Sequence, residues 1–179
     1  MVFNYKLGIT EINNNRININ YREAVRGIIF RDDKFLMVHS NNGDYKFPGG
    51  GAIIDEVHED TLKREVEEET GYIVTKVKDN IGLIIERHPD HFKIGDIFEM
   101  VSSYYLCEVS HEKTSQKLDL YEKELGFNPV WVTLDEAIST NENILNSTSK
   151  TISPWVYRET LALKAIKDNF DLIKNAKVS

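Results

Sequence analysis

The stretch that decides the fold is residues 48–72, which read PGGGAIIDEVHEDTLKREVEEETGY. Its first four residues predict a loop, because proline lacks a backbone donor and glycine adopts backbone angles closed to other residues. Residues 57–70 contain neither glycine nor proline and are mostly good helix formers. Gly71 stands where such a helix would end. The stretch therefore predicts a loop followed directly by a helix.

Three glutamates share one face of this predicted helix. With Glu65 at zero on a wheel of about 100° per residue, Glu68 falls at about −60° and Glu69 at about +40°. Like charges at this spacing cost a helix a few tenths of a kcal/mol per pair, roughly, unless a cation compensates them. A solvated acidic face is the alternative interpretation. Oxygen ligands favour Mg²⁺ or Mn²⁺, and a chain with Cys107 alone and no clustered histidines disfavours zinc.

The segments around this stretch predict alternating strands and helices. Strands are expected at residues 24–30, 35–39 and 45–47 before it, and at 72–77, 81–86, 97–109 and 130–132 after it. A further helix opens at Leu134, and a last one covers 153–175, with Ser153 as its cap and Pro154 at its first position. We therefore expect an α/β fold, with a mixed β-sheet between helices, in one domain over residues 1–179.

The first 20 residues predict a small extension of that domain. Residues 9–12 and 17–20 are rich in isoleucine, and three asparagines at 13–15 separate them. Asparagine favours tight turns, so this pattern predicts an N-terminal β-hairpin.

The charge of the chain is concentrated in the same helix. Lys and Arg total 22 against 29 Asp and Glu, which gives −7. Residues 55–69 contribute eight acids against Lys63 and Arg64, or −6 of that total. Nucleic-acid binding depends on dense Lys and Arg, so nucleic acid is not the expected partner. No apolar run suits a membrane span or a secretory signal, and we expect a cytoplasmic protein.

The spacing from Gly50 to Tyr72 resembles the Nudix box, G-x5-E-x7-R-E-U-x-E-E-x-G-U, where U is a bulky apolar residue. All seven fixed letters match, at Gly50, Glu56, Arg64, Glu65, Glu68, Glu69 and Gly71. At average residue frequencies a chance match has odds on the order of 10⁻⁷. The chain thus resembles the Nudix hydrolase superfamily of the MutT type, which implies an α/β/α sandwich.

The resemblance also implies a metal-dependent enzyme. Its reaction would be Mg²⁺-dependent hydrolysis, with Mn²⁺ as a substitute, of the pyrophosphate bond in a nucleoside diphosphate linked to another moiety. The implied metal ligands are Glu65, Glu68 and Glu69, joined by the carbonyl of Gly50. Relatives often add a glutamate upstream of a later strand, for which Glu124 is the first candidate and Glu122 the second.

The implied catalytic residues are Glu56, Arg64, Glu65 and Glu68. Glu56 and Arg64 would brace the loop against the helix, and the general base is left open, with Glu65 favoured. The leading substrate is a (deoxy)nucleoside triphosphate, and ADP-ribose or a nucleotide sugar is the alternative. A non-catalytic nucleotide sensor is a further alternative, and a homodimer is left open.

Several residues outside the box have either a functional or an ordinary structural role. His88 and His91 would contact substrate or form a polar turn between two strands. Arg22, Arg26 and Arg87 would meet phosphate or remain solvated. Four aromatic residues would stack on a base or pack in the core, with the core favoured: Tyr104, Tyr105, Trp131 and Trp155.

Overall fold

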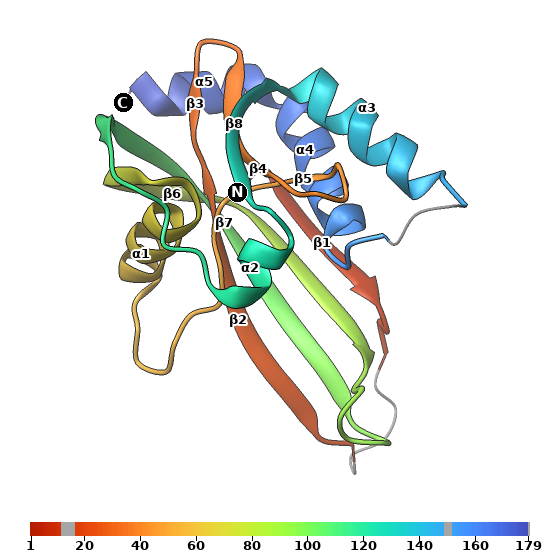
Figure 1. Cartoon of the computed structure of the whole chain (residues 1–179). Coiled ribbons are helices and arrows are strands. Elements are labelled where there is room, and N and C mark those ends of the chain that lie inside the picture. The colour runs from red at the N-terminus through yellow and green to blue at the C-terminus, as the bar shows by residue number, and fades with distance from the viewer. Residues whose placement is uncertain (12–16, 149–151, 179) are drawn as a thin grey trace.

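The computed structural model describes residues 1–11, 17–148 and 152–178, and its elements are shown in Figure 1. The strands are β1 (Phe3–Gly8), β2 (Ile19–Ile28), β3 (Phe30–Arg31), β4 (Lys34–His39), β5 (Tyr45–Lys46), β6 (Tyr72–Pro89), β7 (Ile97–Lys113) and β8 (Asn128–Thr133). The helices are α1 (His58–Thr70), α2 (Leu120–Glu124), α3 (Leu134–Leu145), α4 (Val156–Asp168) and α5 (Phe170–Val178). The helix predicted from the opening stretch is α1, which ends at Gly71 with φ 73°.

The strands form two four-stranded sheets. In the first, the order is β1-β6-β7-β2, with β6 antiparallel to β7 and the two outer strands parallel to their neighbours. In the second, β4 pairs antiparallel with β3, β5 and β8. The α/β class with a mixed sheet is therefore confirmed.

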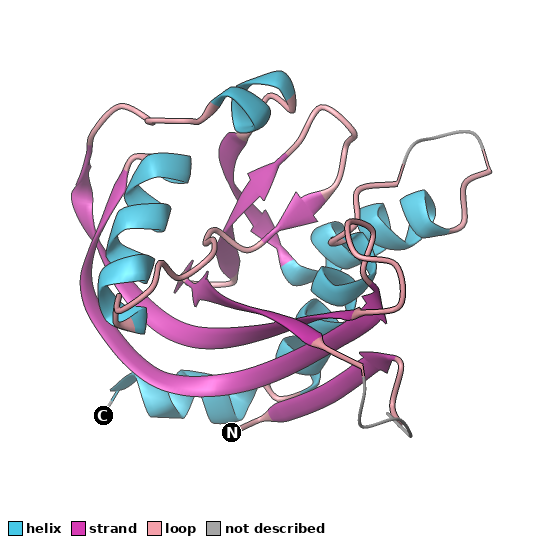
Figure 2. Ribbon diagram, turned by 90° about the horizontal axis from the view of Figure 1, so that it is seen from below, coloured by secondary structure: helices cyan, strands magenta, loops and turns pink. Residues whose placement is uncertain are grey.

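Two hydrophobic cores lie on opposite faces of this framework. On β4, Phe35 and Met37 belong to the core covered by α3, α4 and α5, whereas Leu36 belongs to the core covered by α1. This alternation follows from the two-residue period of a strand. Figure 2 shows the long strands curving around α1, with α5 on the other side of the sheet. Helices thus cover both faces, as in a sandwich.

The predicted N-terminal hairpin is wrong in its pairing and in its first strand, because β1 is Phe3–Gly8 and residues 9–11 form no strand. β1 pairs with β6 and β2 pairs with β7, so these two strands lie at opposite edges of one sheet. The cross-sheet pairing buries Phe3, which is 5% exposed and packs against Tyr104. Ile19, by contrast, is 46% exposed. The expected turn at residues 13–15 lies outside the described residues.

The C-terminal helix also differs from its prediction, because it consists of two helices that meet at Asn169. The side chain of Asn169 donates to the carbonyl of Ala165, and its backbone leaves the helical region at ψ 20°. Ser153 does not cap α4, whose N-cap is Trp155. The Ser153 hydroxyl instead donates to buried Asp44 at 2.8 Å, a tertiary contact that no local pattern reveals.

The strands predicted at 72–77 and 81–86 are one strand, β6, with register shifts between Val77 and Gly82.

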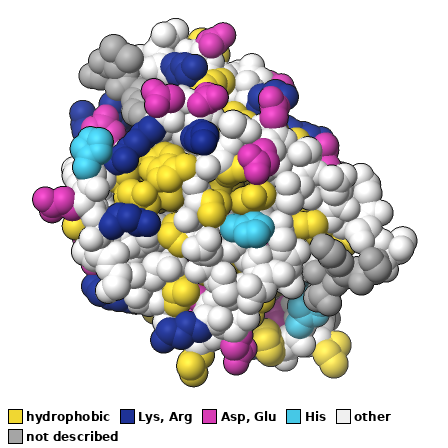
Figure 3. Space-filling view, turned by 45° about the horizontal axis from the view of Figure 1, so that its top comes forward, with side chains coloured by type: hydrophobic (Ala, Val, Ile, Leu, Met, Phe, Trp, Pro, Cys, Tyr) yellow, Lys and Arg dark blue, Asp and Glu magenta, His cyan; other side chains and the backbone are white. Residues whose placement is uncertain are grey.

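Within the described residues, no helix is both long and apolar enough to cross a membrane. On the face drawn in Figure 3, acidic and basic side chains are interspersed around hydrophobic ones.

Candidate active site

Helix α1 is anchored by an apolar stripe. Leu62 and Val66 are fully buried in one core with Val25 of β2 and with Ile29, which follows that strand. Because residues three and four apart share a face, this stripe fixes the rotation of the helix. The glutamates at 65 and 69 are thereby directed toward the loop that precedes the helix.

The loop runs alongside β2 and is held by backbone hydrogen bonds. Val25 N–H donates to the Gly50 carbonyl at 2.9 Å, and Gly27 N–H donates to the Pro48 carbonyl at 2.8 Å. Gly49 has φ 140°, and a Cβ there would lie 2.1 Å from the Val25 carbonyl oxygen. Only glycine fits this approach, which places the loop directly beside α1.

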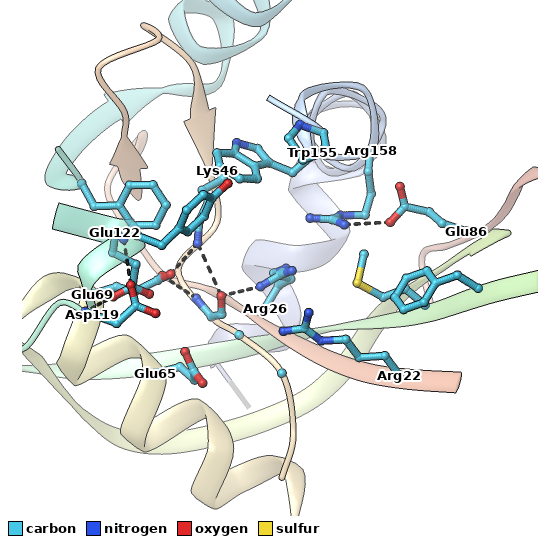
Figure 4. A pocket seen from close by; sticks show the side chains of 18 of the residues that line it. Arg22, Arg26, Lys46, Glu65, Glu69, Glu86, Asp119, Glu122, Trp155 and Arg158 are labelled. Carbon is cyan, nitrogen blue, oxygen red and sulfur yellow. Dashed lines mark hydrogen bonds and ion pairs between the residues drawn. The ribbon is translucent and has the colours of Figure 1, made fainter. Parts of the chain in front are cut away.

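Three carboxylates converge beside the C-terminal half of α1. Oxygen atoms of Glu65, Glu69 and Glu122 all lie within 4.8 Å of one another, and Figure 4 shows their side chains at one end of a cavity. A Cβ at Gly50 would lie 2.1 Å from Oε2 of Glu65. This glycine therefore leaves the space that the Glu65 carboxylate occupies.

Glu69 is buried, with 2% of its surface exposed. Its Oε1 lies 2.5 Å from the ammonium group of Lys46, and its Oε2 accepts from Gly49 N–H at 2.9 Å. Burial raises the pKa of Glu69, and the charge of Lys46 opposes that rise. The pair places a fixed positive charge next to the carboxylate cluster.

Arg64 links the loop to the helix. It donates to both oxygens of Glu56, at 3.0 and 2.8 Å, and its Nη1 lies 2.5 Å from Glu65 and 3.5 Å from Glu68. The Arg64 guanidinium is the main reason that the pKa of Glu56 falls to about 2. The bracing role expected for Glu56 and Arg64 is consistent with this bidentate contact.

The predicted metal ligands are not all brought together. Glu68 lies outside the cluster, its side chain is 38% exposed, and its charged partner is Arg64. Glu124, the first candidate for the additional ligand, is exposed, whereas Glu122, the second candidate, lies in the cluster. Residues two apart on a helix point about 200° away from each other, so α2 can direct only one of them inward. The Glu122 side chain also accepts from Asp119 N–H in a capping box.

The cluster opens into a cavity of about 650 Å³. Its acidic end carries Glu65, Glu69, Asp119 and Glu122. Its basic side chains are Arg22, Arg26, Lys46 and Arg158. Aromatic rings complete the lining, from Phe98, Tyr121, Phe127 and Trp155, with His88 and His91 beside them. The cavity thus joins an acidic end, cationic groups and aromatic surfaces.

The sequence identifies only some of the cavity residues. No local pattern marks Lys46 or Arg158 as a cavity residue, because each reaches the cavity through packing against segments distant along the chain. Five residues for which the sequence leaves a substrate-contacting role open line the cavity: Arg22, Arg26, His88, His91 and Trp155. Arg87 instead pairs with Glu99, and Tyr104 is fully buried in the core.

The fold is shared with solved Nudix hydrolases. A NUDIX hydrolase from Nitrosomonas europaea matches with a TM-score of 0.52 at 20% identity, over 85% of this chain and 90% of that one. A MutT NUDIX hydrolase from Burkholderia pseudomallei matches with a TM-score of 0.51 at 20% identity, over 82% of this chain and 98% of that one. These likenesses concern the fold.

Residues 20–156 match the family described as the NUDIX domain. The chain therefore belongs to the Nudix family. Its sequence is 33% identical, over 90 residues, to an ADP-ribose pyrophosphatase from Methanocaldococcus jannaschii. That match covers 48% of this chain, and the chain spans about half (52%) of the length of the curated relative.

Proposed function

We propose that this protein hydrolyses the pyrophosphate bond of a nucleoside diphosphate linked to another moiety, with Mg²⁺ as its cofactor. The observation that supports the proposal most directly is the arrangement of one cavity. Carboxylates gather at one end of it, and guanidinium groups and aromatic rings line other parts of its wall. A nucleotide offers matching chemistry, since it combines phosphoryl oxygens with a planar base.

The carboxylate cluster fits a hard divalent cation. Glu65, Glu69 and Glu122 offer only oxygen atoms, and within the described residues neither cysteine nor histidine joins them. Mg²⁺ is commonly held by one or two carboxylates together with substrate phosphates, and Mn²⁺ accepts the same ligands. A bound cation would supply charge neutralisation on the phosphoryl oxygens. Glu68 and the carbonyl of Gly50 stay predicted ligands.

The chain's own residues would then position substrate and water. Arg64 donates to Oε1 of Glu65, which fixes the carboxylate and leaves Oε2 beside Gly50. We assign Glu65 as the group that accepts the proton of the attacking water, in line with its place in the box. Lys46 keeps a positive charge beside Glu69 and limits the repulsion within the cluster.

Trp155 is the proposed stacking surface for the base. Its indole N–H donates to Asp44 at 2.6 Å, and Asp44 also accepts from Ser40 and Ser153. This buried network holds the ring in one orientation at the cavity wall. A fixed aromatic plane binds a base at a low cost in side-chain entropy.

Two substrate classes are retained. A (deoxy)nucleoside triphosphate is the leading one, in keeping with the three basic side chains near the Gly-rich loop: Arg22, Arg26 and Lys46. ADP-ribose is favoured by the identity to the archaeal ADP-ribose pyrophosphatase over 90 residues. A panel that contains both classes separates them, since the first releases pyrophosphate or phosphate and the second yields AMP and ribose 5-phosphate.

The experiment is a nucleotide panel incubated with Mg²⁺ and the full chain, with products separated by chromatography. Glu65→Gln and Trp155→Ala are run beside Lys63→Gln, which lies on the exposed side of α1. We expect the first variant to lose at least about 100-fold in kcat, the second to raise KM, and the control to match the parent. If a nucleotide binds tightly but none is cleaved, the protein is a sensor and the proposal is wrong.

A further inference from the structure

Arg22 and Arg26 lie on the same face of β2 and both line the cavity. Residues an even number of positions apart on a strand point to the same side, so both side chains leave β2 on the side of the cavity. Arg158 approaches them from α4, as Figure 4 shows. The cavity wall opposite the carboxylate cluster therefore holds three arginines.

Arg26 is buried without a full set of partners. It is 8% exposed, and its Nη1 donates to the carbonyl of Gly49. Its Nε makes no hydrogen bond, and the nearest carboxylate oxygen, on Glu159, is 3.7 Å away. Burial and the charge of Arg158 lower the pKa of Arg26. A buried donor without an acceptor is costly, which makes it a good candidate to meet a ligand.

Arg22 is exposed, and among the described residues it has no hydrogen bond or ion pair. Its guanidinium lies against the Gly-rich loop, because a Cβ at Gly51 would be 2.8 Å from its Nη2. The loop carries the carboxylate cluster on its other flank, where Glu65 meets Gly50. Arg22 is therefore free to donate to a group that enters the cavity beside the cluster.

The charges around these arginines do not balance. The guanidinium of Arg158 is fully engaged, with 2.7 Å to Glu86 and with two donors to Glu159 at 3.0 and 2.9 Å. Arg22, Arg26 and Arg158 carry three positive charges, and these two glutamates carry two negative ones. One positive charge is left over, and Glu69 does not neutralise it because Lys46 already pairs with Glu69.

We infer that Arg22 and Arg26 form an anion subsite that binds a phosphoryl group of the substrate without the help of a metal ion. The inference rests on the proposed function for the identity of the ligand, and it assigns Arg22 as a substrate-contacting residue. Guanidinium groups bind phosphate through paired, charge-assisted hydrogen bonds, which suits two arginines aligned on one strand. The acidic cluster and the arginines then bind the phosphate chain from its two sides.

The test uses inorganic pyrophosphate as the probe and EDTA to remove divalent cations, so that only protein groups bind it. Binding is measured by calorimetry and by the fluorescence of Trp155, with Trp131→Phe as the parent so that one indole reports. We expect saturable binding, which Arg22→Gln weakens about tenfold and Arg22→Lys weakens less. Lys34→Gln removes one exposed charge far from the cavity lining and should leave binding unchanged.

The outcomes separate this subsite from the proposed reaction. If no nucleotide is hydrolysed but Arg22→Gln still weakens pyrophosphate binding in EDTA, the subsite stands and the reaction does not. If hydrolysis is observed and Arg22→Gln changes neither pyrophosphate binding nor KM, the subsite is overturned. Equal weakening by Arg22→Gln and Lys34→Gln would also overturn it, because the attraction would then be nonspecific.

Discussion

The ammonium group of Lys46 lies 2.5 Å from a carboxylate oxygen of Glu69, and both side chains are almost fully buried. The same ammonium is 3.4 Å from the Gly49 carbonyl and 4.8 Å from the ring centroid of Phe127. The contact joins β5, the Gly-rich loop and α1 at the base of the carboxylate cluster. Breaking one side of a buried ion pair leaves the other charge without compensation.

Lys46→Met should therefore destabilise the protein by about 3 kcal/mol, because it strands Glu69 in a buried position. The double variant Lys46→Met with Glu69→Gln should recover part of this loss, since no buried charge remains. Urea denaturation measures the free energy of unfolding of the parent, Lys46→Met and the double variant. Lys63→Met breaks the exposed pair with Glu59 and is the matched control, which we expect to cost much less stability than Lys46→Met because solvent screens an exposed pair. Equal losses for Lys46→Met and Lys63→Met would contradict the prediction.

This pair also marks the limit of prediction from sequence. The face shared by Glu65 and Glu69 could be deduced, because a helical wheel depends only on local geometry. Lys46 and Glu122 could not be placed, since 23 residues separate Lys46 from Glu69 and their approach depends on how the loop and α2 pack. Glu122 and Glu124 lie two positions apart and point in nearly opposite directions, but only the packing of α2 decides which of them faces the cluster.

For the strands too, some features follow from the local sequence and others depend on distant pairing. Runs of apolar, β-branched and aromatic residues bounded by turn signals located β4 and the start of β6, because such residues favour buried strands. The sequence predicts no strand at β1, since β1 is stabilised by parallel pairing with β6, which joins Phe3 to the distant Gly82. A Cβ at Gly82 would lie 2.0 Å from the ring of Phe3, so this glycine makes the approach possible.

Two of the three glycines of the loop, Gly49 and Gly50, should respond differently to alanine. At Gly49, a Cβ meets the Val25 backbone and φ is 140°, so Gly49→Ala should cost at least about 2 kcal/mol of stability. At Gly50, a Cβ meets only the end of the Glu65 side chain, which can rotate away. Gly50→Ala should therefore keep most of the stability and lose activity. Thermal melts and product assays compare the stability and activity of the two variants. A Gly50→Ala protein that is destabilised but has normal kcat would contradict the prediction for Gly50.

Metal affinity should distinguish two glutamates of α2. Glu122→Gln removes an oxygen ligand from the cluster and should weaken Mn²⁺ binding about tenfold, whereas Glu124→Gln should leave it unchanged. Electron paramagnetic resonance of free Mn²⁺ reports both affinities without a need for turnover. The reverse order would restore Glu124 as the additional ligand.

Acid stability should depend on Glu56. Its folded pKa is about 2, below the ordinary 4.5, so ionised Glu56 stabilises the fold above about pH 4.5, and this contribution is lost as pH falls toward 2. In EDTA, the stability difference between the parent and Glu56→Gln should be present at pH 7 and shrink between pH 4.5 and 2. A difference that is constant with pH would mean that Arg64 does not hold the charge of Glu56.

The thiol of Cys107 should be nearly inert in the folded protein. It is 4% exposed, and burial raises its pKa to about 12 from an ordinary 9. Only the thiolate reacts with iodoacetamide, so alkylation at pH 8 should be about 100-fold or more slower in buffer than in urea. A Ser139→Cys variant in a Cys107→Ala background places an exposed thiol on α3 and should react rapidly in both conditions. Alkylation of native Cys107 at the rate of the exposed thiol would show that the core around α1 opens far more readily than its packing indicates.

The raised pKa of Cys107 also affects stability at high pH. The unfolded chain releases the thiol proton at a lower pH than the folded chain, so the contribution of Cys107 to stability should decline between pH 9 and 12.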